Sequence, residues 1–412
     1  MRAHRSVEGL IRGRLARVAA ACALVLAAGA ARAQAEAPAQ ISPAVAAQID
    51  ALVAEYVPRV LPGLQLAIGK AGAVLYTRGY GMADLRAGVP MTPATPVKIG
   101  SVTKQLTAAT LLKLQEQGKI SLADPLSRWI PEVRYQPEPS IAQVMQMVAG
   151  IPGADKDPDD LLLDGMPAVL QEPPLARAKL FANLQAAGLF APPGTAYDYS
   201  NAGYILLGRV IERASGQPLE AAYTQLLFRP AGMTASYLLG PQPRPGAAVG
   251  HYRVKPGDAW RVCPDLNSGF DATGGVVSTA SDMVRWNGAL KSGAVISAAS
   301  LERMRTPAAL AGGKAAPIGM GLAWLGGQGS YGAAGQTVSF AAANASYGSG
   351  YDVVLLANGS NTIGDAAYPR FVLAARIHNV LNPGAPEPVP ALPPSGGIIE
   401  PAAPAELFTL CK

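Results

Sequence analysis

Strand-like segments lie near both ends of this chain, and the long stretch between them has the pattern of helices. Residues 63–69 and 72–79 are short β-rich runs joined by a glycine turn, the pattern of a β-hairpin. Residues 203–214, YILLGRVIERAS, place apolar side chains at helical spacing. Strands early and late in the chain predict one sheet whose halves are separated by an inserted helical part. The later strand-like runs lie at 274–279, 318–324, 336–346 and 351–357.

Helices are also expected around that sheet. Residues 42–58 carry apolar side chains at helical spacing behind Ser42 and Pro43, a favourable capping and first-turn pair. The pattern that begins at Ser101 is amphipathic and ends at Gly118. We expect the inserted helical part at roughly residues 120–270. The remaining predicted helices lie at 175–189, 281–291 and 370–381.

Most of the positive charge lies before residue 34. The net charge is +6, and six arginines against one glutamate supply +5 of it within residues 1–33. A short apolar run at 18–30 follows the arginines, and Ala31-Arg32-Ala33 offers the small residues that signal peptidase cuts. Residues 1–33 are therefore predicted to be a signal peptide, and the protein is expected to be periplasmic or secreted. A retained membrane anchor is the alternative.

The rest of the chain limits its partners. Its charge is +6 − 5 = +1, so no basic patch indicates nucleic acid. No later stretch is long and apolar enough for a stable membrane span after signal cleavage. Half of the residues are hydrophobic, which predicts a folded domain over 34–382. The dense prolines of 383–412 indicate an extended tail.

Few cysteines and histidines remain after export. Cys263 and Cys411 can form a disulfide, or stay as two free thiols. His251 is expected on a strand near the substrate side, and with His378 it is too isolated for a histidine-based metal site. We therefore expect neither a metal nor another cofactor.

Two polar motifs supply candidate catalytic groups. Ser101 and Lys104 are three residues apart at the start of a helix, so the hydroxyl and the amine share one face as a nucleophile beside a base. Tyr199 and Asn201 lie in a loop directly before another helix. A lysine cation lowers the pKa of a nearby tyrosine, and an asparagine amide can orient the lysine. Taken singly, each motif is better explained without catalysis, the first by a capping serine with a surface lysine and the second by a loop tyrosine with a capping asparagine.

The motifs occur in one order with characteristic flanks. The stretches GYGMADLRAGVPMTPATPVKIGSVTKQLTAATLLKL, PPGTAYDYSNAGYILLGRVIERASGQPL, RPAGMTASYL and GGVVSTASDMVRW resemble the serine β-lactamase-like family. That family includes class C β-lactamases, D,D-peptidases and esterases of the same fold. The resemblance covers roughly residues 45 to 380. It implies a β-lactamase/transpeptidase-like α/β fold, with an antiparallel sheet flanked by helices and an inserted, mostly helical subdomain.

The resemblance also implies roles for individual residues. Ser101 would be the acylated nucleophile, Lys104 would help to deprotonate it, and Tyr199 would be the general base. Asn201 would position substrate and lysine. The oxyanion hole would use the amides of Ser101 and Gln336.

The sequence departs from the family pattern at two motifs. Ala333-Ala334-Gly335 takes the place of Lys-Thr-Gly or His-x-Gly, and only Gly335 is kept. A cation there would bind a substrate carboxylate, a contact worth roughly 1.5 to 3 kcal/mol. Met147-Val148-Ala149-Gly150 replaces His-Thr-Ser-Gly. Loss of the cation at Ala333 favours an esterase over a β-lactamase or carboxypeptidase.

Two hypotheses follow for the function. In the first, the protein is an exported serine hydrolase that forms an acyl-enzyme with a small ester, amide or peptide-like substrate and needs no cofactor. In the second, it is a catalytically impaired relative that binds cell-wall peptides or another ligand in the same cleft. The four polar residues of the two motifs favour the hydrolase, and the departures at Met147 and Ala333 favour the binder.

Overall fold

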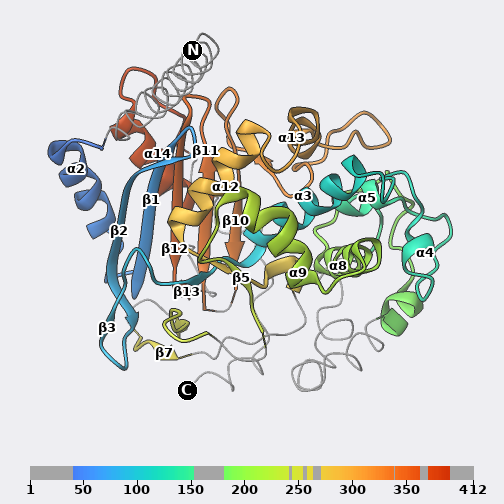
Figure 1. The fold of residues 1–412 in the computed structure, drawn as a ribbon, viewed down its shortest axis with the longest axis horizontal. Helices are drawn as coiled ribbons and strands as arrows, with labels where there is room; N and C mark the ends of the chain where they lie inside the picture. The colour runs from blue at the N-terminus through green and yellow to red at the C-terminus, as the bar shows by residue number, and fades with distance from the viewer. Residues whose placement is uncertain are drawn as a thin grey trace, which may run out of the picture. The chain divides into compact units, whose positions relative to one another are not determined.

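A seven-stranded sheet forms the centre of the fold (Figure 1). The computed structural model describes residues 40–152, 181–240, 244–253, 258–262, 271–337, 339–361 and 370–389, and from Ile41 onward these belong to one unit. All neighbouring strands of the sheet are antiparallel. Its strands come from both ends of the chain, as predicted. Their order is β3 (Val89–Pro90), β2 (Ala73–Asp84), β1 (Gly63–Lys70), β12 (Tyr351–Ala357), β11 (Ala341–Ser346), β10 (Tyr331–Gln336) and β9 (Ala323–Trp324).

The predicted hairpin is confirmed as β1 and β2. Its two-residue turn, Ala71 and Gly72, has φ of 51° and 81°, the conformation of the tight turns that match strand twist. In the centre of the sheet Leu66 pairs with Arg78 on one side and with Leu355 on the other. The early hairpin therefore joins directly to the last long strand of the chain.

Two of the predicted late strands differ in the structure. The single strand predicted over 336–346 is wrong, because Thr337 N donates to Phe340 O at 2.9 Å and closes a tight turn between β10 and β11. The strand predicted over 318–324 is formed only at Ala323–Trp324. β10 itself, YGAAGQ, has no β-branched residue, so strand propensity did not indicate it.

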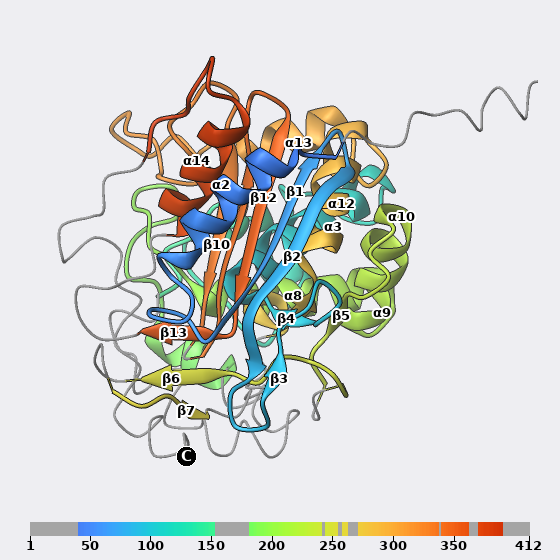
Figure 2. The ribbon, with the colours of Figure 1, turned by 90° about the vertical axis from the view of Figure 1, so that its left-hand side faces the viewer.

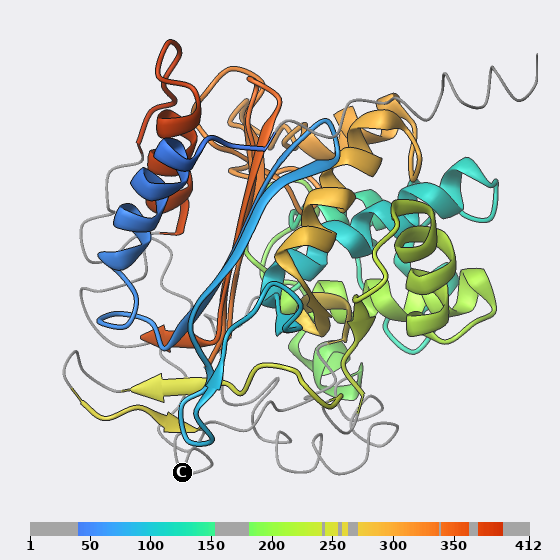
Figure 3. The same cartoon turned by 60° about the vertical axis from the view of Figure 1, so that its left-hand side comes forward.

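Helices cover both faces of the sheet (Figures 2 and 3). The predicted first helix is α2 (Pro43–Ala54), where Ser42 Oγ accepts from Val45 N and Pro43 opens the first turn. It packs with α14 (Arg370–Leu381) on one face. The other face carries α12 (Ala280–Ser292) and, beyond it, α3 (Thr103–Glu116) and α13 (Ala298–Arg305).

The side chains of β1 alternate between the two faces of the sheet and are buried on both, so helices must cover both faces. Leu64, Leu66 and Ile68 are buried against the α2 and α14 side, whereas Ala67 belongs to the core on the other side. Gln65 also lies on that second side and is fully buried. Its amide nitrogen donates to the carbonyls of residues 92 and 95 at 2.7 and 3.0 Å, so the buried polar group is satisfied.

The inserted part is helical and then changes to short strands. The helix predicted over 203–214 is confirmed as part of α8, and the one predicted over 175–189 is described only from residue 181. Two small sheets follow, in the orders β13-β6-β7 and β4-β8-β5. The helices are α4 (Leu126–Trp129), α5 (Ile141–Met145), α8 (Asn201–Ser215), α9 (Leu219–Tyr223), the π-helical turn η3 (Thr224–Phe228), α10 (Arg229–Ala231) and α11 (Asp271–Gly274). The strands are β4 (Val97–Lys98), β5 (Tyr237–Leu238), β6 (His251–Arg253), β7 (Arg261–Val262), β8 (Val276–Ser278) and β13 (Gly359–Asn361).

Several predictions concern residues outside the described ranges. The signal peptide, Cys263 and Cys411 lie there, so their state stays a prediction. The first residues of the predicted tail are described, and Glu387 accepts from Ser330 Oγ at 2.7 Å while its own amide donates to Asn379. In the part of the chain that the structure describes, no helix combines the length and apolar character needed to cross a membrane.

Candidate active site

Ser101 lies in a 3-10 turn that leads directly into α3. This turn, η1 (Gly100–Val102), begins at a glycine with φ of +52°, a left-handed conformation that glycine adopts without strain. A Cβ on Gly100 would lie 3.0 Å from Gln336 N, so the glycine also lets the turn approach β10 closely. Ser101 itself stays partly accessible at the start of the helix.

Lys104 is buried beside the serine, with 2% of its surface exposed. Its Nζ donates to Ser101 Oγ at 3.0 Å, to Asn201 Oδ1 at 2.8 Å and to Thr273 O at 3.1 Å. These three acceptors match the three donors of an ammonium group. The surface-lysine alternative is therefore wrong. The predicted amphipathic helix is also buried nearly all round, because α3 runs through the core of the helical layer.

Tyr199 completes the cluster from the opposite side. Its hydroxyl lies 2.7 Å from Ser101 Oγ, and its ring centroid is 4.8 Å from Lys104 Nζ. The loop that carries it is fixed at its end, where Ser200 Oγ accepts from the amide of residue 203 and caps α8. The structure thus brings together four residues that were predicted as catalytic candidates from two separate motifs: Ser101, Lys104, Tyr199 and Asn201.

β10 brings a second backbone amide to the serine. A Cβ on Gly335 would overlap Ile99 O and lie 3.0 Å from Ser101 N, so only glycine permits this approach. Thr337 N bonds to Phe340 O in the turn, and hydrogen-bonded pairs alternate along an antiparallel ladder. The N–H of Gln336 therefore points away from β11. It is a backbone donor at the free side of the strand, next to the turn that holds Ser101.

The two departures from the family pattern lie next to this cluster. Ala333 is 7% exposed and is two residues from Gly335, so both residues face the Ser101 side of β10. Met147 is buried and has a φ of 57°, which is unusual for a residue with a side chain. Its carbonyl accepts from Asp198 N at 3.1 Å, so the Met147 segment supports the loop that presents Tyr199.

Comparison with known proteins agrees with this geometry. The family model "Beta-lactamase" matches residues 49–376. The chain belongs to the beta-lactamase family. It is 28% identical to PbpX of Bacillus subtilis (strain 168), whose name refers to the penicillin-binding proteins, over 70% of this chain and 68% of PbpX. It is 33% identical to the esterase EstB of Burkholderia gladioli, over half of this chain and 55% of EstB.

Solved structures of the same fold support the membership. The octameric penicillin-binding protein homologue from Pyrococcus abyssi superposes with a TM-score of 0.70 and 26% identity, over 83% of this chain and 79% of that one. The β-lactamase/transpeptidase-like fold is thus confirmed. The family is a superfamily of serine hydrolases that includes esterases.

Two groups at this candidate site had no sequence signal. Thr273 contributes only its carbonyl oxygen, and a backbone acceptor leaves no mark on residue type. Arg370, the first described residue of α14, donates through Nη1 to Gly335 O and through Nη2 to Gln336 Oε1 at 2.7 Å. It is one of many arginines in the chain, and only the packing of α14 shows which one reaches β10.

The two described histidines bond to other groups. His251 lies on strand β6, as predicted, where Nε2 accepts from Leu85 N at 3.3 Å and Nδ1 lies 3.3 Å from Asn358 Nδ2. His378 Nε2 lies 2.7 Å from Ser349 Oγ on the α14 side of the sheet. Burial lowers the pKa of both imidazoles. Within the described ranges, groups of three or more His, Cys, Asp or Glu side chains do not gather as they would around a metal.

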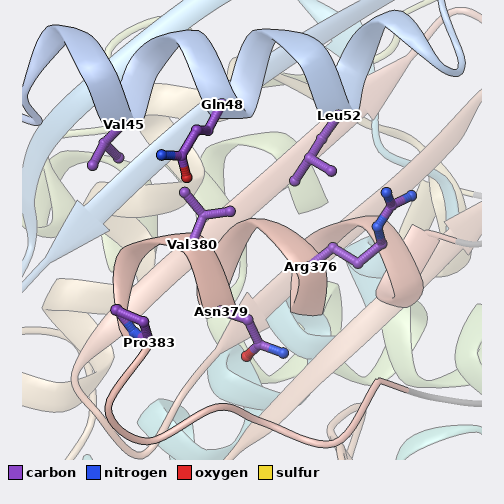
Figure 4. Close-up of a pocket in the computed structure, with 7 residues that line it drawn as sticks. All are labelled: Val45, Gln48, Leu52, Arg376, Asn379, Val380 and Pro383. Carbon is purple, nitrogen blue, oxygen red and sulfur yellow. The ribbon is translucent and has the colours of Figure 1, made fainter.

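A groove between α2 and α14 lies on the face of the sheet opposite α3 (Figures 3 and 4). Its volume is about 690 Å³. Arg376, its one cationic lining residue, is paired with Glu55 at 2.6 Å, so the groove does not gather the reactive groups that surround Ser101. It is lined by Val45, Gln48, Leu52, Arg376, Asn379, Val380 and Pro383.

Proposed function

We propose that this protein is an exported serine hydrolase that forms an acyl-enzyme on Ser101 with a small ester, amide or peptide-like substrate. The observation that carries the proposal is the position of Ser101 Oγ, which is hydrogen-bonded to Lys104 Nζ at 3.0 Å and to the Tyr199 hydroxyl at 2.7 Å. A hydroxyl is a weak nucleophile until an adjacent base takes its proton. Tyr199 is the candidate proton acceptor within hydrogen-bond reach, and Lys104 is the cation beside it.

Acylation uses these groups together. Ser101 Oγ attacks the substrate carbonyl carbon while its proton passes to Tyr199 in the phenolate form, which the Lys104 cation favours. The carbonyl oxygen becomes an oxyanion that accepts from the N–H groups of Ser101 and Gln336. When the tetrahedral intermediate collapses, the bond to the leaving group breaks, and the departing alcohol or amine takes the proton from Tyr199.

Deacylation repeats the steps with water. Tyr199 accepts a proton from water, the hydroxide oxygen attacks the acyl carbon, and the bond to Ser101 Oγ breaks. The proton then returns from Tyr199 to the serine oxygen. Asn201 keeps Lys104 in place through the 2.8 Å bond throughout both half-reactions.

Neutral esters are the proposed substrates. The side chain at position 333 is a methyl group, so this position lacks the cation that would pair with a substrate carboxylate. The esterase name of EstB, 33% identical over half of this chain, supports the same direction. Export rests on the arginine-rich, apolar first 33 residues, and N-terminal sequencing of the mature protein tests it by whether the chain starts at Gln34.

The decisive experiment is intact-mass analysis after exposure to a fluorophosphonate, a penicillin and an activated short-chain ester. Ser101→Ala serves as the control. We expect a serine-dependent adduct with the fluorophosphonate and turnover of the ester. A folded wild-type protein that forms no adduct with any reagent would overturn the hydrolase proposal and favour the second candidate, a ligand-binding relative. The departures from the family pattern at Met147 and Ala333 support that candidate.

A further inference from the structure

We propose that Arg370 is a positioning residue for the oxyanion hole, which holds and polarises the peptide group between Gly335 and Gln336. The inference rests on the proposed function, because an oxyanion hole matters only if Ser101 is acylated. No pattern in the sequence singled out Arg370.

The Arg370 guanidinium contacts the peptide group between Gly335 and Gln336 and the side chain of Gln336. Arg370 Nη1 donates to Gly335 O, and Nη2 donates to Gln336 Oε1 at 2.7 Å. The Gly335 carbonyl and the Gln336 N–H belong to the same amide. One arginine therefore contacts the oxygen of the peptide group whose N–H faces the Ser101 turn, and also the end of the Gln336 side chain.

Arg370 adds to the support that the sheet gives this amide. By the same alternation, Gly335 O points toward β11, where Gly335 pairs with Ala342. β9 pairs with Tyr331 and Gly332 and ends there, so it does not brace the outer side of β10 near Gln336. Gly335 has no side chain that could fix the peptide by packing, because a Cβ would overlap Ile99 O. The guanidinium donates one hydrogen bond to the peptide oxygen and one to the Gln336 side chain, so it holds this segment at two points and restricts rotation of the peptide.

The cation also changes the donor itself. A positive group on an amide oxygen draws electron density from the nitrogen, and hydrogen bonds in a chain strengthen one another by about 10–30% each in a low-dielectric interior. The Gln336 N–H then becomes a stronger donor to the developing oxyanion. Because stabilisation of that charge is realised in the transition state, the effect should appear in kcat rather than in KM.

Direct binding of substrate is the competing role for Arg370. α14 packs on the face of the sheet opposite α3, and both Nη atoms already donate to β10 (Figure 3). A positioning role uses the bonds that the structure shows, whereas a substrate-binding role would require them to break.

The test compares Arg370→Met and Arg370→Lys with wild type on a neutral ester. Arg376→Met is the matched control, since Arg376 is on the same helix and pairs with Glu55 instead of β10. Removal of a whole oxyanion donor costs about 10²- to 10³-fold in kcat, so its weakening should cost about 10- to 100-fold for Arg370→Met. We expect a smaller loss for Arg370→Lys, an almost constant KM, and wild-type kinetics for Arg376→Met.

Infrared spectra of the acyl-enzyme give a readout that a purely structural role would not move. With a slowly hydrolysed ester, the acyl carbonyl stretch should shift to higher wavenumber in Arg370→Met, because the carbonyl is less polarised. If Arg370→Met unfolds, Arg370→Lys is compared with wild type instead. This variant keeps a cation but loses the pair of hydrogen bonds to Gly335 O and Gln336 Oε1.

Each other outcome is decisive. Equal rates and an unchanged carbonyl frequency in a folded variant would overturn the inference while the acyl-enzyme mechanism stood. A rise in KM confined to carboxylate-bearing substrates would replace it with direct substrate binding. Failure of wild type to form any acyl-enzyme would overturn the proposed function, and the inference with it.

Discussion

Lys104 Nζ donates a 2.8 Å hydrogen bond to Asn201 Oδ1 across 97 residues of chain. The bond joins α3 to the start of α8, and the third donor of the same ammonium is used by Thr273 O. The position of the lysine therefore depends on the inserted helical part and on the later chain together. A buried cation held by three acceptors leaves little freedom for Ser101 Oγ, its remaining partner.

We expect Asn201→Ala to lower kcat/KM for an activated ester by about 10- to 150-fold. The reason is the loss of a hydrogen bond to a charged group, worth about 1.5 to 3 kcal/mol. Asn201→Asp keeps an acceptor oxygen for Lys104 and should retain more acylation than Asn201→Ala. Burst kinetics measure this, and equal losses in the two variants would show that holding the lysine is not the role of Asn201.

Gly335→Ala should lower both stability and acylation. Its Cβ would overlap Ile99 O and press on Ser101 N, so β10 must move away from the serine. Overpacking of this kind costs about 1 to 3 kcal/mol. Gly240→Ala is the control, because nothing lies within 4 Å of its added Cβ. Urea unfolding and ester hydrolysis of both variants test this, and a Gly335→Ala protein as active as the control would contradict the close approach.

The sequence predicted the features that depend on local pattern. The hairpin turn at Gly72, the cap at Ser42 and the order of the motifs can all be read along the chain. The same holds for the pairing of Ser101 with Lys104, because three residues on a helix set the distance. Tyr199 came from motif order within the family, and the structure then placed it 2.7 Å from the serine.

Features that depend on packing could not be predicted in this way. Four of the six residues of β10 are Gly or Ala, and its place in the sheet is determined by β11 and by the turn at Thr337. The burial of α3 comes from layers on both sides, so an amphipathic pattern was expected where the helix is buried. Thr273 O and Arg370 act through backbone groups or through helix packing, neither of which residue types alone reveal.

Stability should fall as the pH drops below about 6.5, in part because of His251. Burial lowers the pKa of this imidazole from 6.5, with the neighbouring Asp84 opposing the shift. Its Nε2 accepts a hydrogen bond from Leu85 N, so protonation would place a new Nε2–H against the Leu85 N–H and break this bond. The unfolded chain takes up the proton first, and the contribution present above pH 6.5 is lost as the pH falls through the folded pKa.

Urea unfolding of wild type and His251→Gln from pH 8 to pH 5 measures this contribution. The difference in unfolding free energy between the two proteins should shrink toward low pH. His378, whose pKa burial also lowers, is unchanged in both proteins and cancels in the comparison. A difference that stays constant over the range would show that His251 does not titrate as the structure indicates.

Ala333→His should raise activity on carboxylate-bearing substrates more than on neutral esters. Ala333 faces the same side of β10 as Gly335, so an imidazolium there would offer a substrate carboxylate the partner that position 333 lacks. Such a contact is worth up to about 1.5 to 3 kcal/mol, or about 10- to 150-fold in relative kcat/KM. Ala334→His, on the opposite face, is the control. Ala333 is only 7% exposed, so the larger side chain will also lower stability. The quantity to measure is therefore the ratio of kcat/KM for the carboxylate-bearing substrate to kcat/KM for the neutral ester. This ratio does not depend on the folded fraction. An equal rise for both substrate classes would mean that the cation acts on Tyr199 rather than on the substrate.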